Sequence, residues 1–500
     1  MSIAGHDPSG GAGLGTDLAV WQAMGLHGAS VCTALTVQDR AGVRQIEGTP
    51  LPLLRAALAA QLRHAPPAAV KLGMLGSEEA ADEVATACAA LQVPVVWDTV
   101  LAAAADGRSL LHAGARTLQR LARASLVITP NRVEAARLLG LPGWTQAGLP
   151  PAAWVEAMRA QWLPPGARTQ AVLLKGGHAE GAHSVDWLCT RDRLLALAVP
   201  RLTEGDGGRV HGTGCVYASA LAGRLAQGAG VVQAAVEAQA RTHAAIAAAW
   251  RGADGRAMAN PQAEPDSSDL PWLQGDPAQA MPSFAPLLRR PGLYPVLPDA
   301  DGVLRALESG ADTLQLRIKD MPQAELRAQV RVATEAARSR GAQLFLNDHW
   351  ELALEYQAFG VHLGQDDLPD AQVLCALGAA GLRLGVSTHD LAELARAHAL
   401  QPSYIALGPV WPTRAKQLAH PPLGLGRLRQ WVQRCKPRHV VVGIGGITLE
   451  RAAAAMDCGL DGIAVIGAVV DAADPAQALR AGRAVVDAAL RWRDLVAGSA

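Results

Sequence analysis

Between residues 291 and 500 the sequence repeats one pattern, in which a short apolar run is followed by a stretch with helical periodicity. Apolar residues recur at helical spacing in 324–338, 390–399 and 449–458. Strands that alternate with helices over a region of this length predict a (β/α)8 TIM barrel, with a doubly wound open sheet as the alternative. The eight apolar runs are Leu293–Leu297, Thr313–Leu316, Gln343–Leu346, Gly360–Leu363, Leu382–Val386, Tyr404–Leu407, His439–Val442 and Gly462–Ile466.

A change of composition separates this region from the first half of the chain. The helical pattern of 231–250 gives way to a stretch dominated by Gly, Pro, Asp, Ser and Gln, which offers little apolar surface for a packed element. We therefore expect domains at 1–252 and 291–500, joined by a linker at 253–290. The alternative for the linker is a closing helix near Pro271–Leu273, docked on one domain.

Two glycine-rich loops precede helical patterns in the first half. The first lies within 1–13, after a short apolar strand, and the second is His211-Gly-Thr-Gly-Cys215. Small residues let backbone amides converge, and a helix N-terminus adds positive potential, so the second loop predicts an anion site, most naturally for a phosphate in transit. Cys215 suits the base, or the hydrogen-bond partner, of a substrate hydroxyl. Neither a dinucleotide fingerprint nor a Walker loop occurs.

Charge and cysteine content exclude several classes of function. The chain has 45 basic and 45 acidic residues, so no surface for a polyanion is marked and nucleic acid is not an expected partner. The 7 cysteines show no paired spacing, which favours reduced thiols. No apolar run is long enough to span a bilayer, and Met1 leads straight into an expected strand, leaving no room for a signal peptide. A cytoplasmic protein without membrane contact is expected.

Six motifs of the first half occur in an order that identifies a family resemblance. Together they resemble hydroxymethylpyrimidine/phosphomethylpyrimidine kinase, of the ribokinase-like superfamily, which implies an α/β/α sandwich and ATP as co-substrate. Kinases of this kind are often dimers, so a homodimer through this half is expected. The motifs are Ala4–Gly13, Thr33–Gln38, Lys71–Leu75, Thr129–Asn131, Lys175–His178 and His211–Cys215.

The resemblance also implies roles for single residues. The amides of Gly212, Thr213, Gly214 and Cys215 would hold the transferring phosphoryl group, and Cys215, as a thiolate favoured by the helix N-terminus, would activate the substrate oxygen. The sequence departs from the family at 101–106 and 206–210, which leaves the nucleotide contacts and the flap over the substrate open. The residues expected to bind the pyrimidine are Gly5, Asp7, Ala12, Gln38, Met74 and Val100, and those expected to bind ATP with its magnesium are Asn131, Glu134, Lys175 and Thr213.

Polar residues follow the expected barrel strands at the end where barrel active sites lie. Gln315, Arg317 and Lys319 alternate, so they are expected to point to one side. Glycines after the last two strands predict a phosphate grip made of backbone amides. These residues stand in motifs that resemble thiamine phosphate synthase: Gln-x-Arg-x-Lys, Asn-Asp, Gly-Val-His-Leu-Gly-Gln-x-Asp, Gly-Val-Ser, Gly-Pro-x-x-Pro-Thr-x-x-Lys and Gly-Ile-Gly-Gly-Ile.

This resemblance implies that Asp348 and Asp367 bind Mg²⁺, with Asp366 as the alternative to Asp367. His362 and His389 are expected to be structural or merely near the site. Gln315 would contact the pyrimidine and Ser387 the pyrophosphate. The residues expected to supply charge or donors to the leaving pyrophosphate are Arg317, Lys319, Asn347 and Lys416, and those expected around the thiazole phosphate are Thr413, Gly446, Ile466 and Gly467.

The chain is therefore interpreted as a fusion of two consecutive enzymes of thiamine biosynthesis. The first half would phosphorylate hydroxymethylpyrimidine or its phosphate to the diphosphate, and the barrel would join the diphosphate to thiazole phosphate. Three alternatives stay open: a pyridoxal kinase in the first half, a non-catalytic barrel, and a thiazole tautomerase-like barrel. The sequence does not decide whether the kinase performs one or both phosphorylations, nor whether the diphosphate is channelled.

Overall fold

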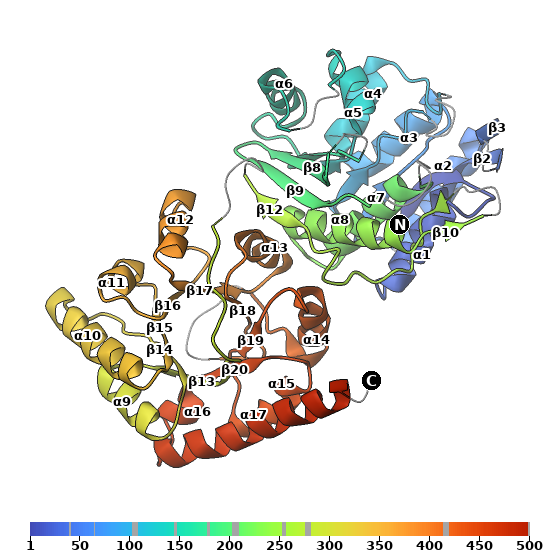
Figure 1. Ribbon diagram of the computed structural model, residues 1–500. Coiled ribbons are helices and arrows are strands. Elements are labelled where there is room, and N and C mark those ends of the chain that lie inside the picture. Colours follow the sequence, from blue (N-terminus) through green and yellow to red (C-terminus); the bar gives the residue numbers. More distant parts are fainter. Residues whose placement is uncertain are drawn as a thin grey trace. The chain divides into compact units, whose positions relative to one another are not determined.

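A computed structural model of the chain describes all residues except 40–41, 65, 103–108, 145–147, 178–180, 203–209, 253–256, 276–281, 414–419 and 499–500. The chain forms two compact units, Met1–Gln279 and Ala280–Ala500 (Figure 1). Among the described residues, no helix combines the length and the apolar character that crossing a membrane requires.

The first unit is built on a ten-stranded sheet. Its strands are β1 (Ser2–His6), β2 (Ser30–Asp39), β3 (Gly42–Gly48), β4 (Val70–Leu72), β5 (Val95–Trp97), β6 (Val127–Ile128), β7 (Ala171–Leu174), β8 (His183–Thr190), β9 (Leu194–Pro200) and β12 (Trp272–Gln274). The strand order is β12-β9-β8-β7-β6-β5-β4-β1-β2-β3, and the pairs from β7 to β2 are parallel. Strands β4 to β7 are buried throughout, so they consist of apolar residues with the single exception of Lys71.

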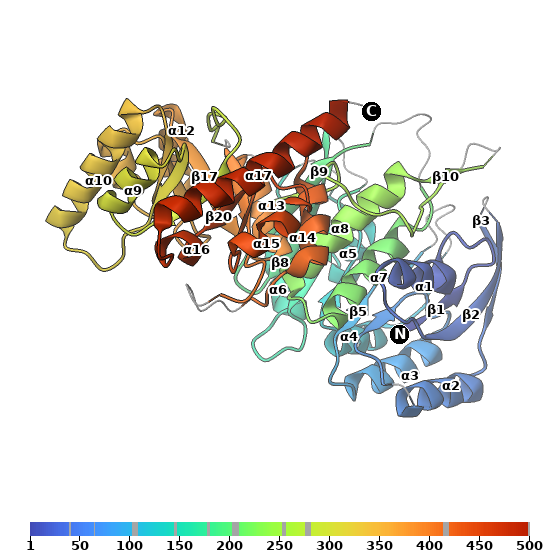
Figure 2. The same cartoon turned by 90° about the horizontal axis from the view of Figure 1, so that it is seen from below.

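Helices cover both faces of this sheet. They are α1 (Gly13–Ala23), α2 (Leu51–His64), α3 (Glu78–Ala89), α4 (Ala115–Ala124), α5 (Arg132–Leu139), α6 (Ala152–Trp162), α7 (Thr213–Ala226) and α8 (Val231–Ala247). Helices α1, α7 and α8 contact one another in series, as do α2, α3 and α4. Figure 2 shows the sheet between these two groups. The predicted α/β/α sandwich is confirmed.

The segment predicted to be a linker is largely part of the first unit. Strand β12 pairs antiparallel with β9, so this stretch is a docked strand and not the helix considered as the alternative. Leu270 and Leu273 are buried, and Asp269 accepts a hydrogen bond from His243 Nδ1 at 2.5 Å. Further upstream, β11 (Ala257–Met258) pairs with β10 (Trp250–Arg251). The prediction rested on the low average apolar content of this stretch. A few buried apolar residues and a buried ion pair nevertheless hold its described part on the sheet.

The second unit is a closed parallel barrel, as predicted, and not a doubly wound sheet. Its strands are β13 (Gly292–Leu297), β14 (Thr313–Leu316), β15 (Gln343–Asn347), β16 (Gly360–Leu363), β17 (Arg383–Thr388), β18 (Tyr404–Leu407), β19 (Val441–Ile444) and β20 (Gly462–Val465), and β13 pairs with β20 to close it. The helices are α9 (Ala300–Glu308), α10 (Gln323–Ser339), α11 (Trp350–Glu355), α12 (Ala371–Ala379), α13 (Leu391–Leu400), α14 (Gly424–Cys435), α15 (Leu449–Met456), α16 (Gly467–Val470) and α17 (Pro475–Gly498).

Candidate active sites

A cavity in the first unit gathers most of the residues predicted to bind substrate. It lies at the ends of β1, β2 and β4 and at the start of α7. Its lining includes Gly5, Asp7, Gln38, Met74, Val100 and Cys215. Ala12 lies just outside this lining, as the residue that precedes α1. These residues, from five separate stretches of sequence, therefore meet at one small space.

The two glycine loops interlock beside this cavity. Gly212 has φ +85°, and a Cβ there would lie 1.9 Å from the carbonyl oxygen of Gly11. His211 Nε2 lies 3.1 Å from Asp7 Oδ2, and its backbone is hydrogen-bonded to Ala257 and Ala259 of the segment once predicted to be a linker. In the described structure no side chain caps α7, so its first amides remain directed at the cavity end.

Cys215 is half-buried at the start of α7, beside a charged pair in the core. Burial raises the pKa of the Cys215 thiol to about 11, although Lys71 beside it acts to lower the pKa. The expectation of a thiolate was therefore wrong for the free protein: removal from water outweighs the neighbouring ammonium group, and the carboxylates of Asp17 and Asp98 oppose a further negative charge. At neutral pH Cys215 is a neutral thiol.

Lys71 and Asp17 were not predicted as site residues. Both side chains are fully buried, and Lys71 Nζ lies 2.8 Å from Asp17 Oδ2. Ser2 and Ser219 donate further hydrogen bonds to Asp17. Burial acts to lower the pKa of Lys71, but the carboxylates of Asp17 and Asp98 raise it, so the side chain stays charged. The signal available in the sequence was a lysine inside an otherwise apolar run.

A second polar group lies next to the anion loop. Lys175 Nζ is 2.8 Å from Asp98 Oδ1, and a Cβ on Gly214 would lie 3.5 Å from Asp98 and 3.6 Å from Lys175. Asn131 and Glu134 form a reciprocal capping box on α5, and Thr99 donates to the Glu134 carboxylate at 2.8 Å. Burial raises the pKa of Glu134. The predicted ATP-binding residues Asn131, Glu134 and Lys175 thus lie near one another, and Asn131 and Glu134 also cap the N-terminus of α5.

The predicted synthase residues lie at the carboxyl ends of the barrel strands. Gln315 is buried within β14, whereas Arg317 is half-buried and Lys319 is exposed. The strand ends at Leu316, so the alternation used to place Lys319 does not extend to it. Asn347 ends β15 and is buried, and Ser387 lies in β17 and is half-buried. Lys416 lies outside the described residues.

The two predicted magnesium ligands follow neighbouring strands. Asp348 comes directly after β15 and Asp367 three residues into the loop that starts at Gly364 after β16, and both are exposed. Asp348 has φ +65°, an uncommon conformation for a residue with a side chain, and it accepts a hydrogen bond from Asn347 Nδ2 at 2.5 Å. Two accessible carboxylates are donors that suit Mg²⁺. The donor set fits the predicted ion.

The loops after β18 and β19 pack closely against each other, and the second of them belongs to the predicted phosphate grip. Gly446 has φ +66°, and a Cβ there would lie 2.6 Å from the carbonyl oxygen of Pro412, next to Thr413. Val410 and Trp411 donate backbone hydrogen bonds to Ile444 and Gly445. Ile466 precedes α16, which begins at Gly467. The glycines are required here because the loops after β18 and β19 touch through their backbones.

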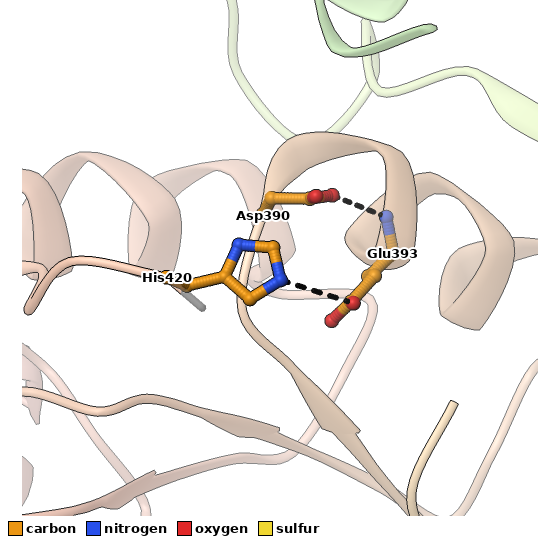
Figure 3. A group of neighbouring side chains, drawn as sticks. All are labelled: Asp390, Glu393 and His420. Atoms are coloured by element: carbon orange, nitrogen blue, oxygen red, sulfur yellow. Dashed lines mark hydrogen bonds and ion pairs between the residues drawn. The ribbon is translucent and has the colours of Figure 1, made fainter. Parts of the chain in front are cut away.

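A group of ionisable side chains lies at the start of α13 (Figure 3). Asp390 caps the helix by accepting from the Glu393 amide, Glu393 also accepts from His389 Nδ1 at 2.8 Å, and His420 Nε2 is 3.8 Å from Glu393. The ligand atoms of Asp390, Glu393 and His420 lie within 4.8 Å of one another. The Asp390 and Glu393 carboxylates each accept hydrogen bonds from neighbouring groups, so these residues stabilise the N-terminus of α13. His389 takes part in this arrangement through Glu393, and its structural role stays a prediction.

Comparison with known proteins gives two family matches. Residues 7–260 match the family model of phosphomethylpyrimidine kinase, and residues 293–469 match that of thiamine monophosphate synthase. The thiamine-phosphate synthase of Escherichia coli (strain K12) is 50% identical over 193 residues, which cover 39% of this chain and 90% of that protein.

Solved structures are similar to each half. A phosphomethylpyrimidine kinase from Clostridium difficile 630 is 28% identical, over 47% of this chain and 93% of that chain, with a TM-score of 0.38. A thiamine phosphate pyrophosphorylase from Pyrococcus furiosus is 33% identical, over 40% of this chain and 98% of that chain, with a TM-score of 0.37.

Proposed function

Because the chain belongs to the phosphomethylpyrimidine kinase family and carries a thiamine-phosphate synthase barrel, we propose that it catalyses two consecutive steps of thiamine biosynthesis. The first unit uses ATP to phosphorylate hydroxymethylpyrimidine or its phosphate to the diphosphate. The barrel joins the diphosphate to hydroxyethylthiazole phosphate, releasing pyrophosphate and thiamine phosphate. The family match disfavours the pyridoxal kinase alternative, and the match of the barrel disfavours a non-catalytic or tautomerase-like one.

The observation that carries the kinase assignment is the meeting of the anion loop with the pyrimidine-binding residues at one cavity. Phosphoryl transfer needs in-line placement and neutralisation of charge more than covalent chemistry. The amides of Gly212–Cys215 hold the transferring phosphoryl group, and Gln38 bonds the edge of the aminopyrimidine. The neutral Cys215 thiol is the hydrogen-bond partner of the substrate oxygen.

ATP binds on the other side of the anion loop. Lys175, held beside Asp98, supplies positive charge to the phosphates, and Thr213 adds an amide at the helix start. Asn131 and Glu134, fixed by their capping box, keep the rim of this site rigid. The flap residues 103–106 and 206–209, where the sequence departs from the family, lie outside the described part of the chain.

The synthase step begins with loss of pyrophosphate. The bond between the pyrimidine methylene and the diphosphate oxygen breaks, the electron pair leaves with pyrophosphate, and the thiazole nitrogen forms the new C–N bond. Asp348 and Asp367 hold Mg²⁺, which when bound neutralises charge on the diphosphate. Arg317, Lys319, Asn347 and Lys416 donate to the leaving group, and the loops at Thr413, Gly446, Ile466 and Gly467 hold the thiazole phosphate.

One assay tests both activities. The purified chain receives hydroxymethylpyrimidine, ATP, Mg²⁺ and thiazole phosphate, and mass spectrometry follows the products. Thiamine phosphate is expected. Repeating the assay from the monophosphate and then from the diphosphate locates a missing step, and product formed from the diphosphate alone would refute the kinase assignment. We also propose a homodimer through the kinase unit and a cytoplasmic location. Sedimentation and cell fractionation test these two proposals.

A further inference from the structure

A chain of hydrogen bonds crosses the interior of the barrel between two predicted substrate-binding residues. Gln315 Nε2 donates to Tyr294 Oη at 3.3 Å, and Tyr294 Oη lies 2.8 Å from Tyr404 Oη. Tyr404 Oη lies 2.7 Å from His362 Nδ1, and His362 Nε2 lies 2.8 Å from Ser387 Oγ. The five residues come from β14, β13, β18, β16 and β17, so only the closed barrel brings them together.

This hydrogen-bond chain runs through the apolar core of the barrel. Tyr294 and Tyr404 are each 1% exposed and pack in the barrel core with Phe345 and Val442. Burial raises the pKa of both phenols, so each keeps its proton. A buried hydroxyl that lacks an acceptor is costly, and each phenol has one proton to donate. The bonds along the chain must therefore all point in the same direction.

The amide of Gln315 sets that direction. Its nitrogen faces Tyr294, so Tyr294 donates to Tyr404 and Tyr404 donates to His362 Nδ1. An imidazole that accepts at Nδ1 carries its proton at Nε2, and His362 then donates to Ser387 Oγ. At the two ends of the hydrogen-bond chain, the Gln315 carbonyl oxygen is an acceptor and the Ser387 hydroxyl is a donor.

We propose that Tyr294, Tyr404 and His362 are positioning residues, which set Ser387 as a donor to the diphosphate and Gln315 as an acceptor for the amino group of the pyrimidine. The proposal rests on the proposed function, which places these two ligand groups. Diphosphate oxygens only accept hydrogen bonds, and an exocyclic amine donates them, so this direction suits both ends of the substrate. The reverse direction would present an acceptor to the diphosphate. From the sequence, His362 is expected to be structural or merely near the site, so a positioning role goes beyond that expectation.

The first test is the tautomer of His362. The full-length protein is labelled with ¹⁵N-histidine, and the His362 signal, one of 14 histidines, is identified by its loss in His362→Gln. Spectra are recorded with inorganic pyrophosphate and Mg²⁺ as the probe. We expect a neutral ring protonated at Nε2. A ring protonated at Nδ1 would overturn the proposal, whether or not the protein makes thiamine phosphate.

The second test is kinetic. Tyr404→Phe keeps the packed ring and removes the hydroxyl that selects the tautomer. With the diphosphate supplied, we expect kcat to fall about tenfold to a hundredfold while the KM for thiazole phosphate stays unchanged. Tyr356→Phe, at the end of α11, makes the same chemical change outside the hydrogen-bond chain and should leave kcat and KM unchanged. Wild-type kcat in Tyr404→Phe would refute the proposal.

Failure of this proposal can be distinguished from failure of the proposed function. If the wild-type chain makes no thiamine phosphate from the supplied diphosphate, the proposed function fails, and the tautomer still decides the proposal. Tyr294→Phe serves as the second variant should Tyr404→Phe not fold, with circular dichroism and kinase activity as checks on folding. A purely structural role would lower stability but would neither shift the tautomer nor separate kcat from KM.

Discussion

Replacing Gly212 by alanine tests the geometry of the anion loop, because the same backbone conformation occurs elsewhere in open space. Gly212 has φ +85° and a new Cβ would lie 1.9 Å from the Gly11 carbonyl oxygen. Gly228, between α7 and α8, has φ +84° with nothing within 4 Å of such a Cβ. The two substitutions share the cost of a left-handed alanine, roughly 1–2 kcal/mol, and differ in the steric conflict.

The size of the effect expected for Gly212→Ala follows from the distance between the new Cβ and the Gly11 carbonyl oxygen. Real Cβ contacts stay above 3.0 Å, so the two loops must separate by about 1 Å. A displacement of this size at a catalytic centre costs about a hundredfold in rate, or about 2.7 kcal/mol of transition-state stabilisation. We expect kinase kcat/KM to fall by that factor in Gly212→Ala and to stay within about threefold of wild type in Gly228→Ala.

The assay compares kinase turnover with synthase turnover in the same molecule. Synthase activity from supplied diphosphate reports on the barrel and should be unchanged in both variants, and urea unfolding measures their stability. Equal and small kinase losses in Gly212→Ala and Gly228→Ala would refute the interlocked loops as the basis of the phosphate site.

Three further predictions concern single side chains. Cys215→Ala should nearly abolish kinase turnover and leave synthase turnover unchanged, whereas Cys215→Ser should retain more of the kinase turnover. Burial raises the pKa of the Cys215 thiol to about 11, so only about 10⁻⁴ of the protein carries a thiolate at pH 7. Because the neutral thiol is the proposed active form, we expect no tenfold rise in kinase rate per pH unit between pH 7 and 9. Such a rise, lost in the serine variant, would show that the thiolate is the base. Asp348→Asn and Asp367→Asn should each weaken Mg²⁺ activation of the synthase at least tenfold, and Asp366→Asn should leave it unchanged; a loss in Asp366→Asn in place of Asp367→Asn would reassign the ligand to Asp366. Lys71→Met should destabilise the first unit by about 3–5 kcal/mol in urea unfolding, and adding Asp17→Asn should recover most of the loss, since the unpaired buried charge is then removed. No recovery would mean that the pair contributes little beyond packing.

Much of the fold followed from local patterns. The eight apolar runs predicted the barrel because a buried parallel strand needs an apolar residue at nearly every position. The glycine loop before α7 was predictable because few residues other than glycine adopt φ +85° beside another backbone. The roles of Asp348, Ser387 and the other site residues came from motif resemblance, and their assignments remain predictions.

The segment 253–290 shows where composition fails. Among its described residues 257–275, the buried Leu270 and Leu273 and the pair His243–Asp269 hold the chain on the sheet, although the average composition is that of a tether. No local pattern indicates that Ala257 and Ala259 flank His211 at the kinase site, because those contacts join residues more than forty positions apart.

The sequence by itself determined the order of strands and helices in the barrel, the two glycine loops and the residue types at the barrel strand ends, because these depend on neighbours along the chain. Only the tertiary structure decided the protonation of Cys215, the burial of Lys71 against Asp17, and the hydrogen-bond chain from Gln315 to Ser387. These depend on which groups meet after folding and on how much water remains between them, and neither quantity is encoded in local spacing.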